Sequence, residues 1–142
     1  MTDAAGLARA YLAAHNDHDA ERLVELYWPQ GSHHEMATGS VREGGAAIGS
    51  GLARLLAAFP DAHWAGEGAL VDGPRAAIPY VLTGTLRQPL GPFPPRGQPL
   101  NLPGLLLLDF DDTGIARSRD YWDAQTFERQ MRPAEAPAPT HR

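Results

Sequence analysis

The sequence predicts one α+β domain, in which three N-terminal helices pack on one face of a curved, mixed or antiparallel sheet. Apolar residues recur at helical spacing before Pro60, whereas after it they follow strand-like patterns separated by Gly- and Pro-rich turns. A chain of 142 residues is long enough for a single core. A bent sheet with helices across its mouth forms a cone, and we expect the interior of this cone to hold a small molecule.

Three helices and one strand are expected in the first half. Two helices fall within residues 1–31, because apolar residues recur at helical spacing on both sides of a polar break. Asp19 would cap the second of them. The other boundaries expected here are the polar break at 16–19, a helix end at 28–31, a strand over about 32–37, a turn at 38–40 and a helix from about Gly44 to Phe59.

Strands dominate the second half. The elements expected there are strands over 62–71, 75–86, 100–110 and 114–123, turns at 72–74 and 111–114, and a helix over 125–131. The segment 87–99 is too rich in proline for a central strand, and it could be a lid over a pocket or a long hairpin end. We expect the domain to span residues 1–131 and the Pro/Ala-rich tail 132–142 to be disordered.

The amino-acid composition excludes several kinds of catalytic chemistry and of binding partner. The chain has no cysteine, which excludes disulfides, thiolate nucleophiles and cysteine-ligated metal centres. All 12 basic residues are arginine, so lysine Schiff-base chemistry is excluded as well. A formal net charge of -5 without a basic cluster argues against a nucleic-acid partner, and no apolar run is long enough to span a membrane or form a leader. We therefore expect a cytoplasmic protein that needs no cofactor.

The segment 114–123 carries the strongest functional signal. Strand alternation sends Ala116, Ser118 and Asp120 to one face, and the small side chains on this face leave room for a ligand. We therefore assign Asp120 to the cavity, while Asp123 is placed to cap the following helix. The alternative is that both aspartates form a polar strand end.

A second polar group lies on the strand expected over 32–37. Alternation puts His33 and Glu35 on one face, where they could share a ligand and where burial would raise the pKa of Glu35 for proton transfer. The pair could also supply two metal ligands, but no further histidine has a recognisable ligand spacing, so we expect no metal. The alternative is a half-exposed edge strand. Tyr11, on the buried face of the first helix, could donate a hydrogen bond to an oxyanion or could belong to the core.

Three short motifs resemble those of one protein family: Phe59-Pro60-Asp61, Asn101-Leu102-Pro103-Gly104 and, above all, Arg119-Asp120-Tyr121-Trp122-Asp123. With the order of elements, they are similar over about residues 5–131 to the SnoaL-like branch of the nuclear-transport-factor-2 (NTF2-like) superfamily. That branch includes polyketide cyclases, cofactor-free hydroxylases, ketosteroid-isomerase-like enzymes and limonene-epoxide-hydrolase-like proteins. The resemblance implies a cone-shaped fold that is commonly dimeric through its sheet. It also implies that Asp120 is the catalytic aspartate and that His33 and Glu35 are polar pocket residues.

The sequence departs from two subgroups of this branch. The epoxide hydrolases resemble one another in an Arg-x-Asp pair on the middle strand, and residues 80–85 contain neither an arginine nor an aspartate. The aldol cyclases carry a pocket histidine on the penultimate strand, where this chain has four leucines at 105–108. The resemblance therefore implies the branch and leaves the reaction open.

We expect a cofactor-independent acid–base enzyme of secondary metabolism, such as antibiotic biosynthesis. It would act as a homodimeric cyclase or isomerase on a hydrophobic polyketide- or terpenoid-like substrate. Asp120 would move the proton, while His33, Glu35 and Tyr11 would orient the substrate and stabilise an enolate. The substrate-binding wall is expected to include Phe59, His63, Leu102, Leu106 and Trp122. The alternatives are an enzyme that hydrolyses or rearranges an epoxide and a domain that binds a small molecule without catalysis.

Overall fold

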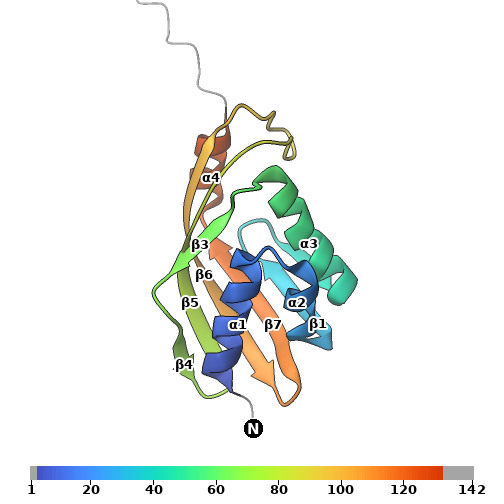
Figure 1. Cartoon of the computed structure of the whole chain (residues 1–142). Coiled ribbons are helices and arrows are strands. Elements are labelled where there is room, and N and C mark those ends of the chain that lie inside the picture. The colour runs from blue at the N-terminus through green and yellow to red at the C-terminus, as the bar shows by residue number, and fades with distance from the viewer. Residues whose placement is uncertain (1–2, 133–142) are drawn as a thin grey trace, which may run out of the picture.

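The computed structural model describes residues 3–132 and confirms the α+β class. The helices are α1 (Ala4–Asn16), α2 (Ala20–Glu25), α3 (Gly45–Ala58) and α4 (Ala124–Met131). The strands are β1 (Tyr27–Glu35), β2 (Ser40–Glu43), β3 (His63–Gly66), β4 (Leu70–Asp72), β5 (Arg75–Thr85), β6 (Pro99–Asp111) and β7 (Gly114–Trp122). Figure 1 shows α1, α2 and α3 together on one side of the sheet, with α4 near the loop that joins β5 to β6. Within residues 3–132, no helix is long and apolar enough to cross a membrane.

All seven strands belong to one sheet, in the order β2-β1-β7-β6-β5-β3, with β4 also paired to β5. Paired strands are antiparallel except β1 and β7, which run parallel. In this parallel pair His33 lies opposite Ser118, and Glu35 lies opposite Asp120. The pairing therefore brings the two polar segments side by side, although 85 positions separate His33 from Ser118.

The core lies between the three N-terminal helices and the inner face of the sheet. From the helices it receives Ala8, Tyr11, Leu23, Ile48 and Leu52, all buried. Alternate residues of β5 and β6 face them, as the two-residue period of a strand requires. These buried strand residues are Ala76, Ile78, Tyr80, Leu82, Leu100, Leu102, Leu106 and Leu108. Each large apolar side chain buried here contributes roughly 1.5–3 kcal/mol of transfer free energy, so the periodic pattern fixes which face of each element turns inward.

Aspartates begin two of the predicted helices. The side chain of Asp19 accepts a hydrogen bond from the backbone N–H of Arg22, and that of Asp123 accepts one from the N–H of Thr126. Each bond satisfies an N–H group that lacks a partner in the first turn of a helix, which is worth about 1 kcal/mol. The predictions that Asp19 and Asp123 are helix caps are confirmed.

Several boundaries differ from the sequence prediction. Residues 28–31 belong to β1 instead of ending a helix, because the chain already pairs with β7 at Tyr27. The turn at 38–40 leads into an additional strand, β2, which pairs with the outer edge of β1. The single strand expected over 62–71 is divided into β3 and β4. Most of the tail that we expect to be disordered lies outside the described residues.

A β-bulge shifts the alternation near the start of β7. The neighbouring residues Asp109 and Phe110 of β6 pair with Arg117 and Ile115, so one residue of β7 is extra. Strict alternation predicted Ile115 on the face opposite Ser118, but Ile115 is fully buried. Beyond the bulge the predicted alternation holds, and it carries every second side chain of β7 to the inner face.

Candidate active site

A cavity of about 310 Å³ lies between the N-terminal helices and the inner face of the sheet. This volume is at the lower end of the range for small-molecule pockets. Most of the wall is aliphatic and consists of Leu23, Ile48, Leu52, Leu55, Leu82, Leu90, Leu100, Leu102 and Leu106. Leu90 comes from the Pro-rich segment between β5 and β6, so this segment forms part of the wall. Polar side chains are concentrated on the strands, where they meet this apolar surface.

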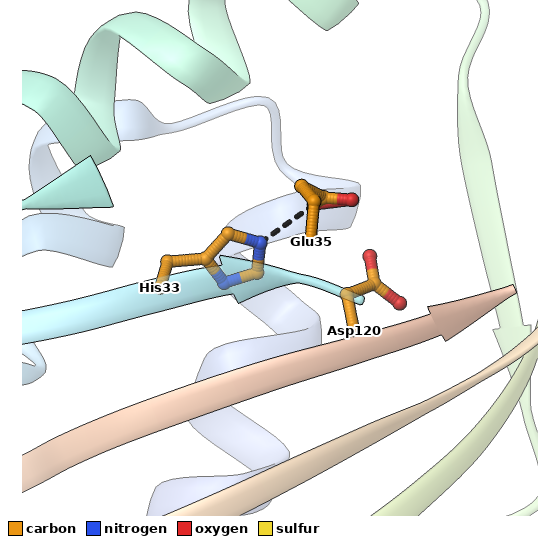
Figure 2. A group of neighbouring side chains, drawn as sticks. All are labelled: His33, Glu35 and Asp120. Atoms are coloured by element: carbon orange, nitrogen blue, oxygen red, sulfur yellow. Dashed lines mark hydrogen bonds and ion pairs between the residues drawn. The ribbon is translucent and has the colours of Figure 1, made fainter. Parts of the chain in front are cut away.

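Glu35 and Asp120 form a pair of carboxyl groups in the cavity. They lie directly opposite each other on β1 and β7, and Figure 2 shows their side chains, with that of His33, on the same side of these strands. Burial, and next the negative charge of Glu35, raises the pKa of Asp120 from 3.8 to about 7. Asp120 therefore exchanges a proton near neutral pH, as a general acid or base must.

Glu35 is the ionised member of this pair. His33 Nε2 lies 2.7 Å from Glu35 Oε1, and Trp122 Nε1 donates a hydrogen bond of 2.8 Å to Oε2. The guanidinium of Arg42 lies 3.8 Å from Oε1. Burial acts to raise the pKa of Glu35, but the hydrogen bond and charge of His33, followed by Trp122 and Arg42, lower it overall. The raised pKa that the sequence predicts for Glu35 is therefore wrong, because these three neighbours outweigh the effect of burial.

A chain of hydrogen bonds leads from α1 to this carboxylate. Tyr11 Oη lies 2.9 Å from Tyr27 Oη, which lies 2.5 Å from Ser118 Oγ, and Ser118 Oγ lies 2.7 Å from His33 Nδ1. The imidazole of His33 thus bridges the two groups, with Nδ1 toward the Ser118 hydroxyl and Nε2 toward the Glu35 carboxylate. Burial raises the pKa of Tyr27 to about 12 and that of Tyr11 well above 10.0, so both phenols keep their protons.

Several polar side chains of the cavity were not predicted from the sequence, among them those of Tyr80 and His15. Tyr80 Oη donates a hydrogen bond of 2.7 Å to Oδ1 of Asp120. His15 Nδ1 lies 2.8 Å from the backbone oxygen of Tyr11, and burial lowers the pKa of His15 to about 4, so this ring is neutral at neutral pH. His15 could have been found, because it lies four residues after Tyr11 on the same helix face. The contact of Tyr80 depends on how β5 and β6 pair across the Pro-rich segment, which composition does not reveal.

Arg42 was not predicted either, because the short strand that carries it was not expected. It extends from β2 over Gly51 of α3, where an added Cβ would lie only 2.6 Å from its Nε. The absence of a side chain at Gly51 therefore lets the guanidinium line the cavity beside Glu35.

The structure brings together most of the predicted site residues. Those that line the cavity are Tyr11, His33, Glu35, Leu102, Leu106, Asp120 and Trp122. Phe59 does not line it, because this fully buried ring follows the end of α3 and packs against Gly84 in the core. His63 is exposed, since Trp64 pairs with the buried Leu82 and takes the inward position of β3. The assignments of Phe59 and His63 to the wall are therefore corrected.

His33, Glu35 and Asp120 could in principle hold a cation. One potential ligand atom from each lies within 4.8 Å of the other two. Binding would require Asp120 to lose its proton and would place a second positive charge near Arg42, which already lies 3.8 Å from Glu35. The hydrogen bond between His33 and Glu35 occupies the same imidazole nitrogen that a metal would need. The residues present therefore suit proton exchange better than metal binding.

Solved structures share this fold along most of their length. A provisionally assigned polyketide cyclase from Xanthomonas campestris is 26% identical, with 89% of this chain and 95% of that chain covered and a TM-score of 0.79. A protein of ketosteroid-isomerase-like fold from Catenulispora acidiphila, solved with trimethylamine, is 22% identical, with 92% and 94% covered and a TM-score of 0.76. AclR, a provisionally assigned hydroxylase from Streptomyces galilaeus, is 19% identical, with 89% and 82% covered and a TM-score of 0.77. These similarities confirm the NTF2-like fold.

Comparison of the sequence with family models identifies the family as well as the fold. No curated protein matches the chain. The family model of SnoaL-like polyketide cyclases, however, matches residues 5–131, which include every strand and helix from β1 to α4. The chain therefore belongs to the SnoaL-like polyketide cyclase family.

Proposed function

We propose that this protein is a cofactor-independent acid–base enzyme. It catalyses ring closure or isomerisation of a small hydrophobic carbonyl compound of polyketide or terpenoid type. One observation carries the proposal: a carboxyl group, Asp120, lies in a largely apolar cavity with its pKa raised to about 7 beside the ionised Glu35. A strongly perturbed carboxyl in a cavity is typical of catalytic sites.

The proposed reaction is an intramolecular aldol closure. The ionised form of Asp120 removes a proton from the carbon next to a substrate carbonyl, and the C–H electron pair forms an enolate. The enolate carbon attacks a second carbonyl of the same molecule, so that a C–C bond forms and an alkoxide results. Protonated Asp120 then returns its proton to this alkoxide, and no oxidant or reductant is consumed. An isomerisation uses the same first step, with the proton returned to a different carbon.

The neighbouring polar groups have supporting roles in this proposal. The negative charge of Glu35 makes Asp120 a stronger base than an ordinary aspartate. His33 fixes the orientation of Glu35, and Tyr11 begins the hydrogen-bond chain that holds His33. Leu102, Leu106 and the other apolar side chains exclude water and bind the hydrophobic part of the substrate.

Proton exchange on a simple ketone tests this function without knowledge of the natural substrate. The probe is 2-tetralone, a compact apolar ketone, incubated with the protein in deuterated water while NMR follows loss of the hydrogen signal beside its carbonyl. We expect exchange to be faster with the protein than without it. Asp120→Asn should lower the catalysed rate on the order of a hundred- to ten-thousandfold, the usual contribution of a general acid or base.

Asp123→Asn is the matched control, because Asp123 belongs to the same short motif but caps α4. It should retain the exchange rate of the unchanged protein. Exchange that is equally fast with Asp120→Asn would refute the assignment, and an unchanged protein that binds 2-tetralone without accelerating exchange would favour ligand binding without catalysis.

We also propose that two copies associate through the outer face of the sheet. The half-buried side chains of Val81, Leu105, Leu107 and Tyr121 give this face an apolar centre. Light scattering during gel filtration should give the mass of a dimer, and Leu107→Glu should give a monomer that retains the fold. A monomeric mass for the unchanged protein would contradict this part of the proposal. A cytoplasmic role in secondary metabolism, including antibiotic biosynthesis, completes the proposal and is supported by the family alone.

A further inference from the structure

We infer that Tyr80 is a positioning residue that holds one oxygen of Asp120 and leaves the other, Oδ2, as the atom that exchanges the proton with substrate. This inference rests on the proposed function, since it concerns how the same carboxyl group works. It assigns a role to a tyrosine of β5 and to the glycine that its ring crosses.

The contact joins strands that are not neighbours. Tyr80 lies on β5 and Asp120 on β7, and β6 runs between them. On β6, Gly104 is the register partner of Tyr80, and Leu106 is the partner of Asp120. The ring of Tyr80 must therefore pass diagonally over β6 before its hydroxyl reaches Asp120 Oδ1 at 2.7 Å.

Gly104 makes this path possible. A Cβ added at residue 104 would overlap the Cζ and Oη atoms of Tyr80 and lie 2.7 Å from Cε2. Any other residue would thus force the hydroxyl end of the ring away from β6. The position of the Tyr80 phenol therefore depends on Gly104, because the phenol occupies the space that a side chain at residue 104 would fill.

The direction of the hydrogen bond decides what each carboxyl oxygen can do. Burial, and next the charge of Asp120, raises the pKa of Tyr80, so the phenol keeps its proton and acts as the donor. Oδ1 of Asp120 therefore accepts the hydrogen bond from Tyr80 whether Asp120 is ionised or neutral. The proton of neutral Asp120 is left to Oδ2, which receives no hydrogen bond from any residue within 3–132. A fixed carboxyl with one free oxygen meets the geometric demand of proton transfer.

The same bond also sets the acidity of the group. A donor on Oδ1 stabilises the carboxylate, and it lowers the pKa of Asp120 against the effects of burial and Glu35. A tyrosine that only filled space would have no such effect. The titration of Asp120 therefore distinguishes a positioning role from a packing role.

The experiment follows the side-chain carboxyl carbon of isotope-labelled Asp120 by NMR from about pH 4 to about pH 10. Tyr80→Phe keeps the ring and removes the donor, and it should weaken the acid by about tenfold in its dissociation constant, as expected for one hydrogen bond to a charged group. Gly104→Ala keeps the phenol but displaces it, and it should shift the titration in the same direction. Tyr121→Phe is the control, because Tyr121 lies on the outer face of β7, and its titration should match that of the unchanged protein.

The exchange of 2-tetralone provides the second readout. Its pH profile should move upward in Tyr80→Phe by the same amount as the titration of Asp120. An unchanged midpoint in both Tyr80→Phe and Gly104→Ala would overturn the inference, and if one variant fails to fold, the other decides. Failure of the proposed function would look different: the titration would still respond to Tyr80, while the unchanged protein would not accelerate exchange.

Discussion

Asp120 and Asp109 lie on adjacent strands of one sheet, yet their environments push their pKa values in opposite directions. Asp120 faces the cavity, where burial and the charge of Glu35 raise its pKa to about 7. Asp109 faces outward, where burial acts to raise its pKa but hydrogen bonds and charges from Arg75 and Arg117 lower it overall. Burial acts to raise the pKa of both aspartates; at Asp120 the charge of Glu35 adds to this effect, whereas at Asp109 the neighbouring arginines outweigh it.

Ionisation of the two aspartates also has opposite effects on the stability of the fold. Arg75, Arg117 and Arg119 hold Asp109 at 2.8, 3.0 and 3.2 Å, which favours the ionised carboxylate. Asp120 is buried beside the negative charge of Glu35, and these two effects outweigh the hydrogen bond from Tyr80, so ionisation of Asp120 is disfavoured in the folded state. The protein therefore gains stability from ionised Asp109 and loses stability when Asp120 ionises.

The largest effect on stability is expected from Asp120→Asn at alkaline pH. The pKa of Asp120 is raised on folding, so the folded state binds a proton that the unfolded state has released between about pH 4 and about pH 7. The free energy of unfolding of the native chain must fall across this window and level off above it. Asn carries no charge and avoids the loss, so it should stabilise the fold at about pH 8 by on the order of 3 kcal/mol.

Urea denaturation at about pH 5 and about pH 8 measures this difference. The advantage of Asn should be clearly smaller at the lower pH, where Asp120 is still protonated in the folded state. An equal advantage at both pH values would mean that Asp120 is not the buried acid described above.

A smaller effect of opposite sign is expected from Asp109→Asn. Removing the carboxylate leaves three arginines facing one another, which should lower the free energy of unfolding by about 1 kcal/mol at neutral pH. Because the pKa of Asp109 is lowered on folding, its stabilisation is lost as the pH falls through that lowered value, and so the difference should shrink in acid. The exchange of 2-tetralone should not change. A loss of exchange in Asp109→Asn comparable to that in Asp120→Asn would erase the contrast between the two faces.

Periodicity predicted the helices, the strand-rich second half and the inward position of Asp120, because these features depend on residues close together in the chain. The parallel pairing of β1 with β7 follows from contacts across 85 positions, and periodicity carries no information about it. The resemblance to a known family supplied what periodicity could not, namely that His33, Glu35 and Asp120 belong to one pocket.

Each difference between prediction and structure has a specific cause. His63 was assigned to the wall although its neighbour Trp64 has the inward parity, and Phe59 was placed there although α3 ends before the ring can reach the cavity. The prediction for the pKa of Glu35 is wrong because two of the three neighbours that stabilise its charge, Trp122 and Arg42, lie on other strands. Tyr80 was missed because its role depends on a glycine in the facing strand.

The parallel contact between β1 and β7 also affects how the molecule can be made. The last strand within residues 3–132, β7, lies between β1 and β6, so a nascent chain that stops before Gly114 leaves a gap in the middle of its sheet. The strand that carries His33 and Glu35 then lacks its partner β7, and the cavity lacks the wall that Asp120 and Trp122 form. Residues as far as β7 must therefore be synthesised before the sheet can close, and the pairing of β1 with β7 is the kind of long-range contact that slows folding.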